Sequence, residues 1–229
     1  ALGAKSVAVS GSLKADAAPL PVDEAALEQF KAAVGTRPLF LAASTHPREE
    51  ALLLDVALTL RPMNALTVIV PRHPSRGAEI ETEALAKGLA ARRRSTGALP
   101  ESTTEIYVAD TLGELGLFYR AAPFAFLGGS LIPHGGQNPL EPARLGTAVI
   151  TGPHTHNFDE TFRALLAAQG EGLVRTPEDL NAVVARLIDD PALAHHLGER
   201  AQTAAAGMGG ALKHTVDVAE ALLARHACS

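Results

Sequence analysis

The chain has 229 residues, of which 47% are hydrophobic, and this is enough for a buried core in one large or two small domains. Its formal net charge of −5 and its aromatic content of 4%, with no Trp, argue against a nucleic-acid surface that stacks bases. The single cysteine, Cys228, excludes an internal disulfide framework and favours a reducing compartment, and no apolar run is long enough to span a membrane.

The first 22 residues differ in character from the rest of the chain. Val7-Ala8-Val9 predicts a short strand, and the segment 16–23 (DAAPLPVD) has no helical or strand period, which indicates a linker. We expect residues 1–22 to be the interdomain strand and linker that follow a missing preceding domain. Asp23 is then predicted to cap a helix that extends to about Val34.

Short apolar runs alternate with longer amphipathic stretches between residues 39 and 174. The runs predict buried strands at Leu39–Ala43, Leu66–Val70, Glu105–Val108, Phe124–Leu127, Ala148–Ile150 and Gly172–Val174. Helices are predicted from about Glu49, and at Ile80–Arg93, Gly113–Arg120 and Phe158–Gln169. This order predicts an α/β fold with a Rossmann-like, doubly wound parallel sheet of about six strands, which binds ligands at the carboxyl edge.

The C-terminal part is predicted to be helical. Its helices are expected at Pro177–Asp189, Pro191–Ala206 and Ala211–His226. We expect residues 23–206 to form one ligand-binding domain and residues 207–229 a helix directed towards the missing domain. The apolar stripe of that helix would then be uncovered, and self-association or disorder is expected there.

A basic run, Arg92-Arg93-Arg94, comes at the end of the helix predicted at Ile80–Arg93. Cations are favoured at a helix C-terminus, so we interpret the run as a solvated helix end. Contact with an anionic membrane is the alternative.

Two turns after predicted strands are candidates for a binding site. Pro71 and Arg72 follow the second strand, and an arginine there can bind a phosphate or a base edge through paired N–H groups. Its alternative is a solvated, proline-rich loop. After the third strand, Asp110 or Thr111 predicts a helix N-cap, with Glu114 completing a capping box.

The functional interpretation of this second turn uses its backbone. The N–H groups of Leu112 and Gly113 come at a helix start, where backbone donors have no partner within the helix. They can therefore read a nucleobase.

The segment 127–146 (LGGSLIPHGGQNPLEPARLG) carries the strongest signal. Its glycines, at 128–129 and 135–136, let the backbone approach a ligand closely, and a helix beginning near Pro139 offers N–H groups to a phosphate. Glu141, in the first turn, can accept two hydrogen bonds from a ribose diol. The spacing matches neither a Walker A loop nor the dinucleotide fingerprint GxGxxG.

Two further polar segments follow strands. Ser44-Thr45-His46 is predicted to cap the next helix. The segment 152–158 (GPHTHNF) indicates either substrate contact or a helix entry capped by Asn157. His154 and His156 have no third ligand at a suitable spacing, so we expect no metal.

Together these motifs resemble the transferases of Kdo (3-deoxy-D-manno-oct-2-ulosonic acid). The resemblance runs from about residue 7 to about residue 190. It rests on Ala43–His46 with Glu49-Glu50, PRHPSR at 71–76, DTLGEL at 110–115, GGSLIPHGGQNPLEPA at 128–143 and TGPHTHNF at 151–158, and the stretch Gly11–Asp16 is similar to the interdomain stretch of the family. Jointly the motifs are specific, whereas any one of them recurs across GT-B glycosyltransferases.

The resemblance implies the donor-binding, C-terminal half of a GT-B enzyme. Such an enzyme transfers Kdo from CMP-Kdo to a lipid A precursor, lipid IVA, in lipopolysaccharide synthesis, with inversion and without a metal or other cofactor. By resemblance, CMP is held by Pro71, Arg72, Leu112, Gly113, Glu114, Asn138, Pro139, Leu140 and Glu141. No catalytic residue is assigned, because the general base and the acceptor surface of the family lie in the N-terminal domain.

The resemblance also implies that the whole enzyme acts at the cytoplasmic face of the inner membrane. The fragment itself is expected to be soluble and inactive alone, with no nucleic-acid partner. Gln137 stands where the family often has His, and Leu112 where it often has Met. The alternatives are another GT-B enzyme that uses a UDP-sugar, either a transferase or an epimerase, and a stand-alone nucleotide-binding module.

Overall fold

The computed structural model describes residue 7 and residues 13–227. Its centre is a six-stranded sheet in the order β3-β4-β2-β1-β5-β6, in which every pairing is parallel. The strands are β1 (Leu39–Thr45), β2 (Leu66–Pro71), β3 (Ala91–Arg93), β4 (Ile106–Val108), β5 (Phe124–Leu127) and β6 (Ala148–Thr151). The predicted α/β, doubly wound fold is confirmed.

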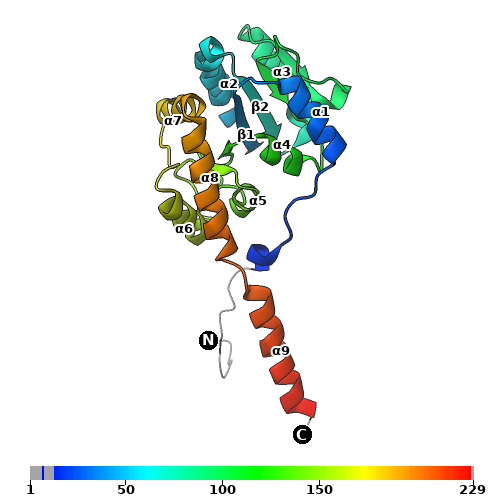
Figure 1. Cartoon of the computed structure of the whole chain (residues 1–229), viewed down its shortest axis with the longest axis vertical. Coiled ribbons are helices and arrows are strands. Elements are labelled where there is room, and N and C mark those ends of the chain that lie inside the picture. Colours follow the sequence, from blue (N-terminus) through cyan, green and yellow to red (C-terminus); the bar gives the residue numbers. More distant parts are fainter. Residues whose placement is uncertain (1–6, 8–12, 228–229) are drawn as a thin grey trace.

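Helices cover both faces of the sheet (Figure 1). One face packs against α1 (Glu24–Val34), α4 (Leu115–Ala121), α5 (Leu140–Arg144) and α6 (Asp159–Gln169), and the other against α2 (Glu49–Leu60), α3 (Gly77–Ala86) and α7 (Pro177–Asp189). Helix α8 (Pro191–Ala206) contributes to both cores, and α9 (Ala211–Ala227) follows it. Short 3₁₀ turns are η1 (Leu13–Asp16), η2 (Arg61–Met63), η3 (Pro74–Arg76) and η4 (Arg94–Thr96).

The strands other than β3 are mostly apolar because both of their faces are buried. In β1, Leu39, Leu41 and Ala43 belong to one core, while Phe40 and Ala42 belong to the other. Successive side chains of a strand point to opposite faces, so a strand between two helical layers has no solvent face. This arrangement leaves only the strand ends for ligand binding.

Arg92 and Arg93 of the basic run belong to the edge strand β3 and Arg94 begins η4, so the interpretation of the run as a solvated helix end was wrong. Helix α3 ends at Ala86, Gly88 has a positive φ of 74°, and residues 91–93 then pair with β4. Arg93 forms ion pairs with Glu81 and Asp110. Charged side chains are common on edge strands, since they discourage pairing with other chains.

The strand predicted at Gly172–Val174 is reduced to a single bridge between Thr151 and Leu173. Gly172 has a φ of 119°, which takes the backbone out of the extended region and prevents a longer ladder. The other strand predictions between residues 39 and 151 agree with the structure to within two residues. Asp23 caps α1 as predicted, by accepting a hydrogen bond from the Ala26 N–H.

Helix α9 extends away from the body of the domain (Figure 1). Its apolar side chains Leu212, Val216 and Leu223 are exposed, as the sequence predicts. At its start, the Asp16 carboxylate accepts hydrogen bonds from the N–H groups of Gly210 (2.5 Å) and Leu212 (2.7 Å). These bonds lower the pKa of Asp16. The predicted strand at residues 7–9, the resemblance at residues 11–12 and Cys228 lie wholly or partly outside the described residues.

We predict that Asp16→Asn weakens the attachment of α9 to η1. The neutral amide is a poorer acceptor than the carboxylate for the two N–H groups at the helix start. Amide hydrogen exchange at Leu212 should become several-fold faster (about threefold or more) in this variant. Asp217→Asn is the control, because Asp217 only pairs with Lys213 one turn away; equal exchange at Leu212 in the two variants would contradict the prediction.

Candidate functional site

The candidate site lies at the carboxyl ends of the central strands. Strand β1 lies between β2 and β5, so the chain order reverses beside it. In open α/β sheets this switch point opens a crevice between the loops that follow the two strands. Here those loops begin at Thr45 after β1 and at Gly128 after β5.

A bulge ends β1 and brings it close to the loop after β5. The register of β1 against β2 shifts between Ala43 and Thr45, and Ser44 has a left-handed φ of 56°. A Cβ atom at position 128 would lie 2.4 Å from the Ser44 carbonyl oxygen, so only glycine fits there. The Ser44–His46 segment is therefore a strained strand end, and the prediction that it caps α2 was wrong. Helix α2 begins instead after Arg48, without a side-chain cap.

The fully buried carboxylate of Glu49 holds this crevice together. Its two oxygens accept hydrogen bonds from the N–H groups of Gly129 (2.6 Å), Ser130 (3.0 Å) and Leu131 (3.0 Å), and a fourth comes from the His46 N–H (3.2 Å). Burial raises the pKa of Glu49, and the four N–H donors oppose that rise. The first glycine turn thus has its N–H donors occupied by an internal carboxylate, so these donors are not open to a ligand.

A second buried carboxylate, Glu50, fixes the loop after β2. It forms an ion pair with Arg76 at 2.6 Å and accepts a hydrogen bond from the Thr45 hydroxyl. Arg76 is therefore committed to structure. By contrast, the side chain of Arg72 is exposed and has no hydrogen-bond or ion-pair partner among the described residues, while its N–H donates to the Thr45 carbonyl. Buried Pro71 precedes it at the end of β2.

The second glycine turn leads into α5 with several predicted site residues close together. The Asn138 side chain accepts a hydrogen bond from the Leu140 N–H (3.2 Å) and donates one to Glu141 (3.1 Å). Pro139, predicted at the first helical turn, is the residue just before the helix, and it is buried together with Leu140. No hydrogen bond among the described residues uses the backbone N–H of Gln137 or Asn138. These two donors remain available to a ligand.

Glu141 lies half-buried close to several cations. Burial raises its pKa, whereas the hydrogen bond from Asn138 and the charges of Arg144, Arg72 and Lys14 lower it. The charge of Arg72, in the loop after β2, thus acts on Glu141 in the first turn of α5. A carboxylate in such a position can accept hydrogen bonds from hydroxyl groups while the neighbouring guanidinium binds an anion.

The turn at Leu112-Gly113 stands apart from that pair. Leu112 is 81% exposed, and Gly113 has a positive φ of 82°. Glu114 is bound by Arg94 and by the Thr111 hydroxyl, and the charge of Arg94 and these hydrogen bonds lower its pKa. No hydrogen bond or ion pair among the described residues joins this turn to Arg72 or Glu141. The groups of this turn that a ligand could bind are the exposed backbone atoms of Leu112 and Gly113.

The N-cap predicted at Asp110 or Thr111 was wrong. The buried carboxylate of Asp110 accepts hydrogen bonds from the N–H and hydroxyl of Ser95, and it pairs with Arg93. It therefore fastens the edge strand to β4. Helix α4 begins after Glu114 with no side-chain cap.

Three histidines at the crevice were not singled out together from the sequence. We call His46, His73 and His134 the histidine cluster. The ring centroids of His46 and His134 are 3.9 Å apart, and those of His46 and His73 are 6.4 Å apart. The Gln137 amide nitrogen donates to the His46 Nε2 at 3.0 Å. A histidine directly after the central strand was the available sequence signal.

The pKa of His46 is lowered to about 4. Burial is the main cause, and the charges of His134, His73 and Arg72 add to it. His46 is therefore neutral near pH 7, which suits a ring that accepts a hydrogen bond through Nε2.

The loop at 152–158 packs against the second glycine turn. The Asn157 amide donates to the carbonyls of His134 (3.1 Å) and Gly136 (3.4 Å). It does not cap α6, which begins after Phe158 without a side-chain cap, so that prediction was wrong. Among the described residues, no group of three or more His, Cys, Asp or Glu side chains is arranged to hold a metal ion.

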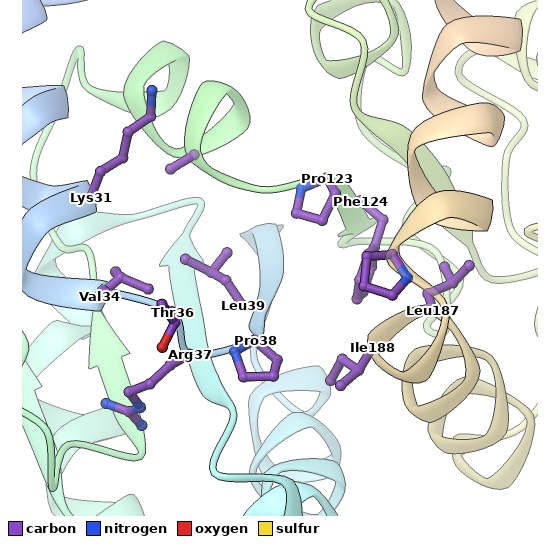
Figure 2. Close-up of a pocket in the computed structure, with 13 residues that line it drawn as sticks. Lys31, Val34, Thr36, Arg37, Pro38, Leu39, Pro123, Phe124, Leu187 and Ile188 are labelled. Carbon is purple, nitrogen blue, oxygen red and sulfur yellow. The ribbon is translucent and has the colours of Figure 1, made fainter.

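A cavity of about 270 Å³ lies at the opposite edge of the sheet, at the amino ends of β1 and β5 (Figure 2). Its cationic residues are engaged elsewhere. Arg37 donates to the carbonyl oxygens of Asn64, Ala65, Glu101 and Thr104, and Lys31 pairs with Glu28. The cavity therefore lacks a free cationic side chain such as the one that Arg72 presents at the carboxyl edge.

No protein-family model matches the chain. The 3-deoxy-D-manno-octulosonic acid transferase of Haemophilus influenzae is 38% identical over 193 residues, which are 83% of this chain and 45% of that protein. The transferase of the same name from Bordetella pertussis is 37% identical over 226 residues, 95% of this chain and 52% of that protein.

The solved structure of the C-terminal CMP-Kdo binding domain of WaaA from Acinetobacter baumannii is also similar. Its TM-score is 0.73 at 28% identity, over 80% of this chain and 98% of that one. The resemblance to the C-terminal domain of the Kdo transferases is confirmed. The chain spans about half the length of the Kdo transferases that it matches. No helix among the described residues has the length and apolar character needed to cross a membrane.

We predict that Glu49→Ala lowers the free energy of unfolding by about 3 kcal/mol or more, because it leaves buried N–H groups of two loops without an acceptor. Urea denaturation of the chain measures this. Glu28→Ala is the control, since Glu28 is exposed and pairs only with Lys31, and it should cost less than about 1 kcal/mol. Similar losses in the two variants would show that the buried carboxylate is not the main link.

We predict that the free energy of unfolding depends on pH through His46. Because the pKa of His46 is about 4 in the folded state and 6.5 in the reference state, the unfolded chain binds more protons between these values. The stabilising effect of a neutral His46 is complete above pH 6.5 and is lost as the pH falls towards 4. Urea unfolding at a series of pH values gives the free energy of unfolding as a function of pH. Between pH 4 and 6.5 this free energy should change less steeply with pH for His46→Gln than for the wild type or the exposed control His195→Gln. An unchanged slope in His46→Gln would contradict this.

Proposed function

We propose that this chain is the donor-binding domain of a Kdo transferase and that it binds CMP-Kdo at the carboxyl edge of its sheet. The observation that carries the proposal is an exposed Arg72 without an ion-pair partner among the described residues, whose charge acts on a half-buried Glu141 that follows the open N–H groups of Gln137 and Asn138 in the chain. The likeness to a solved CMP-Kdo binding domain supports the choice of ligand.

Each part of the nucleotide has a group that suits it. Arg72 and the N–H groups of residues 137 and 138 would bind the phosphate, because a guanidinium and backbone donors complement its charge. Glu141, oriented by Asn138, would accept hydrogen bonds from the ribose diol. The exposed backbone at Leu112-Gly113 would read the cytosine, and Glu114, neutralised by Arg94, would hold that turn in place.

In the whole protein, this domain would steady CMP as it leaves Kdo. Positive groups fixed around the phosphate stabilise the charge that develops there, so the transfer needs no metal for this purpose. We propose that the acceptor is a lipid A precursor, lipid IVA, and that attack by its hydroxyl inverts the anomeric centre. A glutamate in the N-terminal domain would take the proton of that hydroxyl at the cytoplasmic face of the inner membrane. The 229-residue chain alone would then transfer nothing.

A donor domain for a UDP-sugar is the second candidate, because the fold and the acidic first turn would serve a uridine nucleotide as well. A stand-alone nucleotide-binding module is a third. The choice of base separates the first two, and activity of the whole protein separates both from the third.

Calorimetric titration with CMP and UMP tests the proposal. We expect the chain to prefer CMP, and we expect Arg72→Ala and Glu141→Ala each to weaken CMP binding about tenfold or more, since each removes a charge-assisted hydrogen bond. Arg163→Ala and Glu160→Ala are matched controls on the exposed side of α6. Preference for UMP would replace Kdo transfer with a UDP-sugar reaction, and variants that bind CMP as well as the wild type would move the site elsewhere.

A further inference from the structure

The nucleotide as placed above does not use the histidine cluster. Its members come from the loops after β1, β2 and β5, and so from all three strands at the centre of the sheet. His46 is buried, whereas His73 and His134 are exposed. The cluster thus combines one buried imidazole, that of His46, with the imidazoles of His73 and His134, which a ligand can reach.

The backbone is shaped to bring these rings together. Gly129 has a φ of 69°, and a Cβ atom there would lie 3.1 Å from the His134 ring and 3.3 Å from the His46 ring. His46 is held at two points. Its backbone N–H donates to Glu49, and its ring Nε2 accepts a hydrogen bond from Gln137. A ring fixed in this way positions its neighbours and has little freedom to bind a ligand itself.

The cluster has no anion of its own. Neither His73 nor His134 has a side-chain hydrogen bond or ion pair among the described residues. The nearby carboxylates are already engaged, Glu49 with four N–H groups and Glu50 with Arg76. Two exposed imidazoles beside an unpaired arginine, with no carboxylate bound to either ring among the described residues, suit a small anion better than a cation.

The position of the cluster indicates which part of the sugar nucleotide the anion would be. His73 follows Arg72 directly, and Gln137 precedes Asn138, so the cluster adjoins the proposed phosphate site on two separate loops. In a 2-ulosonic acid the carboxylate is attached to the anomeric carbon, which is also the carbon that bears the phosphate. The carboxylate of a bound CMP-linked sugar acid must therefore lie next to the phosphate.

We propose that His73 and His134 bind the carboxylate of the donor sugar, and that His46 and Gln137 position them. The proposal rests on the proposed function and extends it to the choice of sugar. An aldose attached to the same nucleotide has no carboxylate at the anomeric carbon, so it would leave these donors without a partner. The histidine cluster would thus select sugar acids over ordinary sugars.

Calorimetry with two ligands, CMP and CMP-Kdo, tests this on the 229-residue chain. The variants are His73→Gln, His134→Gln and the double variant, which change exposed side chains, with His195→Gln on the exposed face of α8 as the control. We expect the double variant to weaken CMP-Kdo about tenfold and CMP by no more than about twofold, because only CMP-Kdo carries the carboxylate. His195→Gln should change neither affinity.

The two possible failures can be distinguished. A wild-type chain that binds neither ligand overturns the proposed function and this inference with it. If the wild type binds both ligands and the double variant weakens them equally, or weakens neither, the donor site stands and the carboxylate site is overturned. The CMP arm therefore reports on the nucleotide site, and the ratio of the two affinities reports on the histidine cluster.

Discussion

The buried carboxylate of Glu49 is the interaction on which the site depends. It comes from the first turn of α2 and accepts N–H groups from the strand end of β1 and from the turn after β5. A buried charge is tolerated only when such donors surround it, and a buried N–H only when it finds an acceptor. Glu49 therefore joins two loops that are about 80 residues apart in the chain. Its carboxylate accepts the backbone N–H groups of a glycine turn, which in many nucleotide-binding proteins bind a phosphate.

This internal anion has a consequence for where a ligand can bind. With the donors of residues 129–131 occupied, the proposed phosphate would use other donors, and those of residues 137 and 138 are open at the entry to α5. The arginines divide in a similar way. Arg76, Arg93 and Arg94 are each neutralised by a carboxylate, whereas Arg72 is not. A chain with a net charge of −5 thus presents a local positive charge at the carboxyl edge of its sheet.

The sequence was sufficient for the parts of the fold that periodicity determines. Apolar runs identified five of the six strands, and capping by Asp23 and the helices at 177–189 and 191–206 followed from local signals. The edge strand at 91–93 was missed because it consists largely of arginines, whose charges are balanced by residues distant in the sequence. Local pattern cannot reveal such partners. For the same reason Asp110, Asn157 and Ser44–His46 were taken for helix caps, although the first two bind groups in other loops.

The candidate site also has a part that local sequence predicts and a part that depends on contacts between loops. Arg72, Asn138 and Glu141 were found from strand ends and a glycine-rich turn, and the structure brings Arg72 and Glu141 close together. The roles of Glu49 and of the histidine cluster depend on contacts between loops, which no spacing rule contains. Among the described residues, no hydrogen bond joins the turn at Leu112-Gly113 to these groups, so only a bound ligand would connect it to them.

The most direct test of the account is to map the binding of CMP by amide chemical shifts across the isotopically labelled chain. The two edges of the sheet offer distinct outcomes, since the cavity of about 270 Å³ is at the amino edge near Arg37 and Phe124 (Figure 2). The account predicts that the largest shifts occur at Arg72, Gly113, Gln137 and Asn138. Shifts concentrated around Arg37 and Phe124, with the carboxyl edge unchanged, would contradict it.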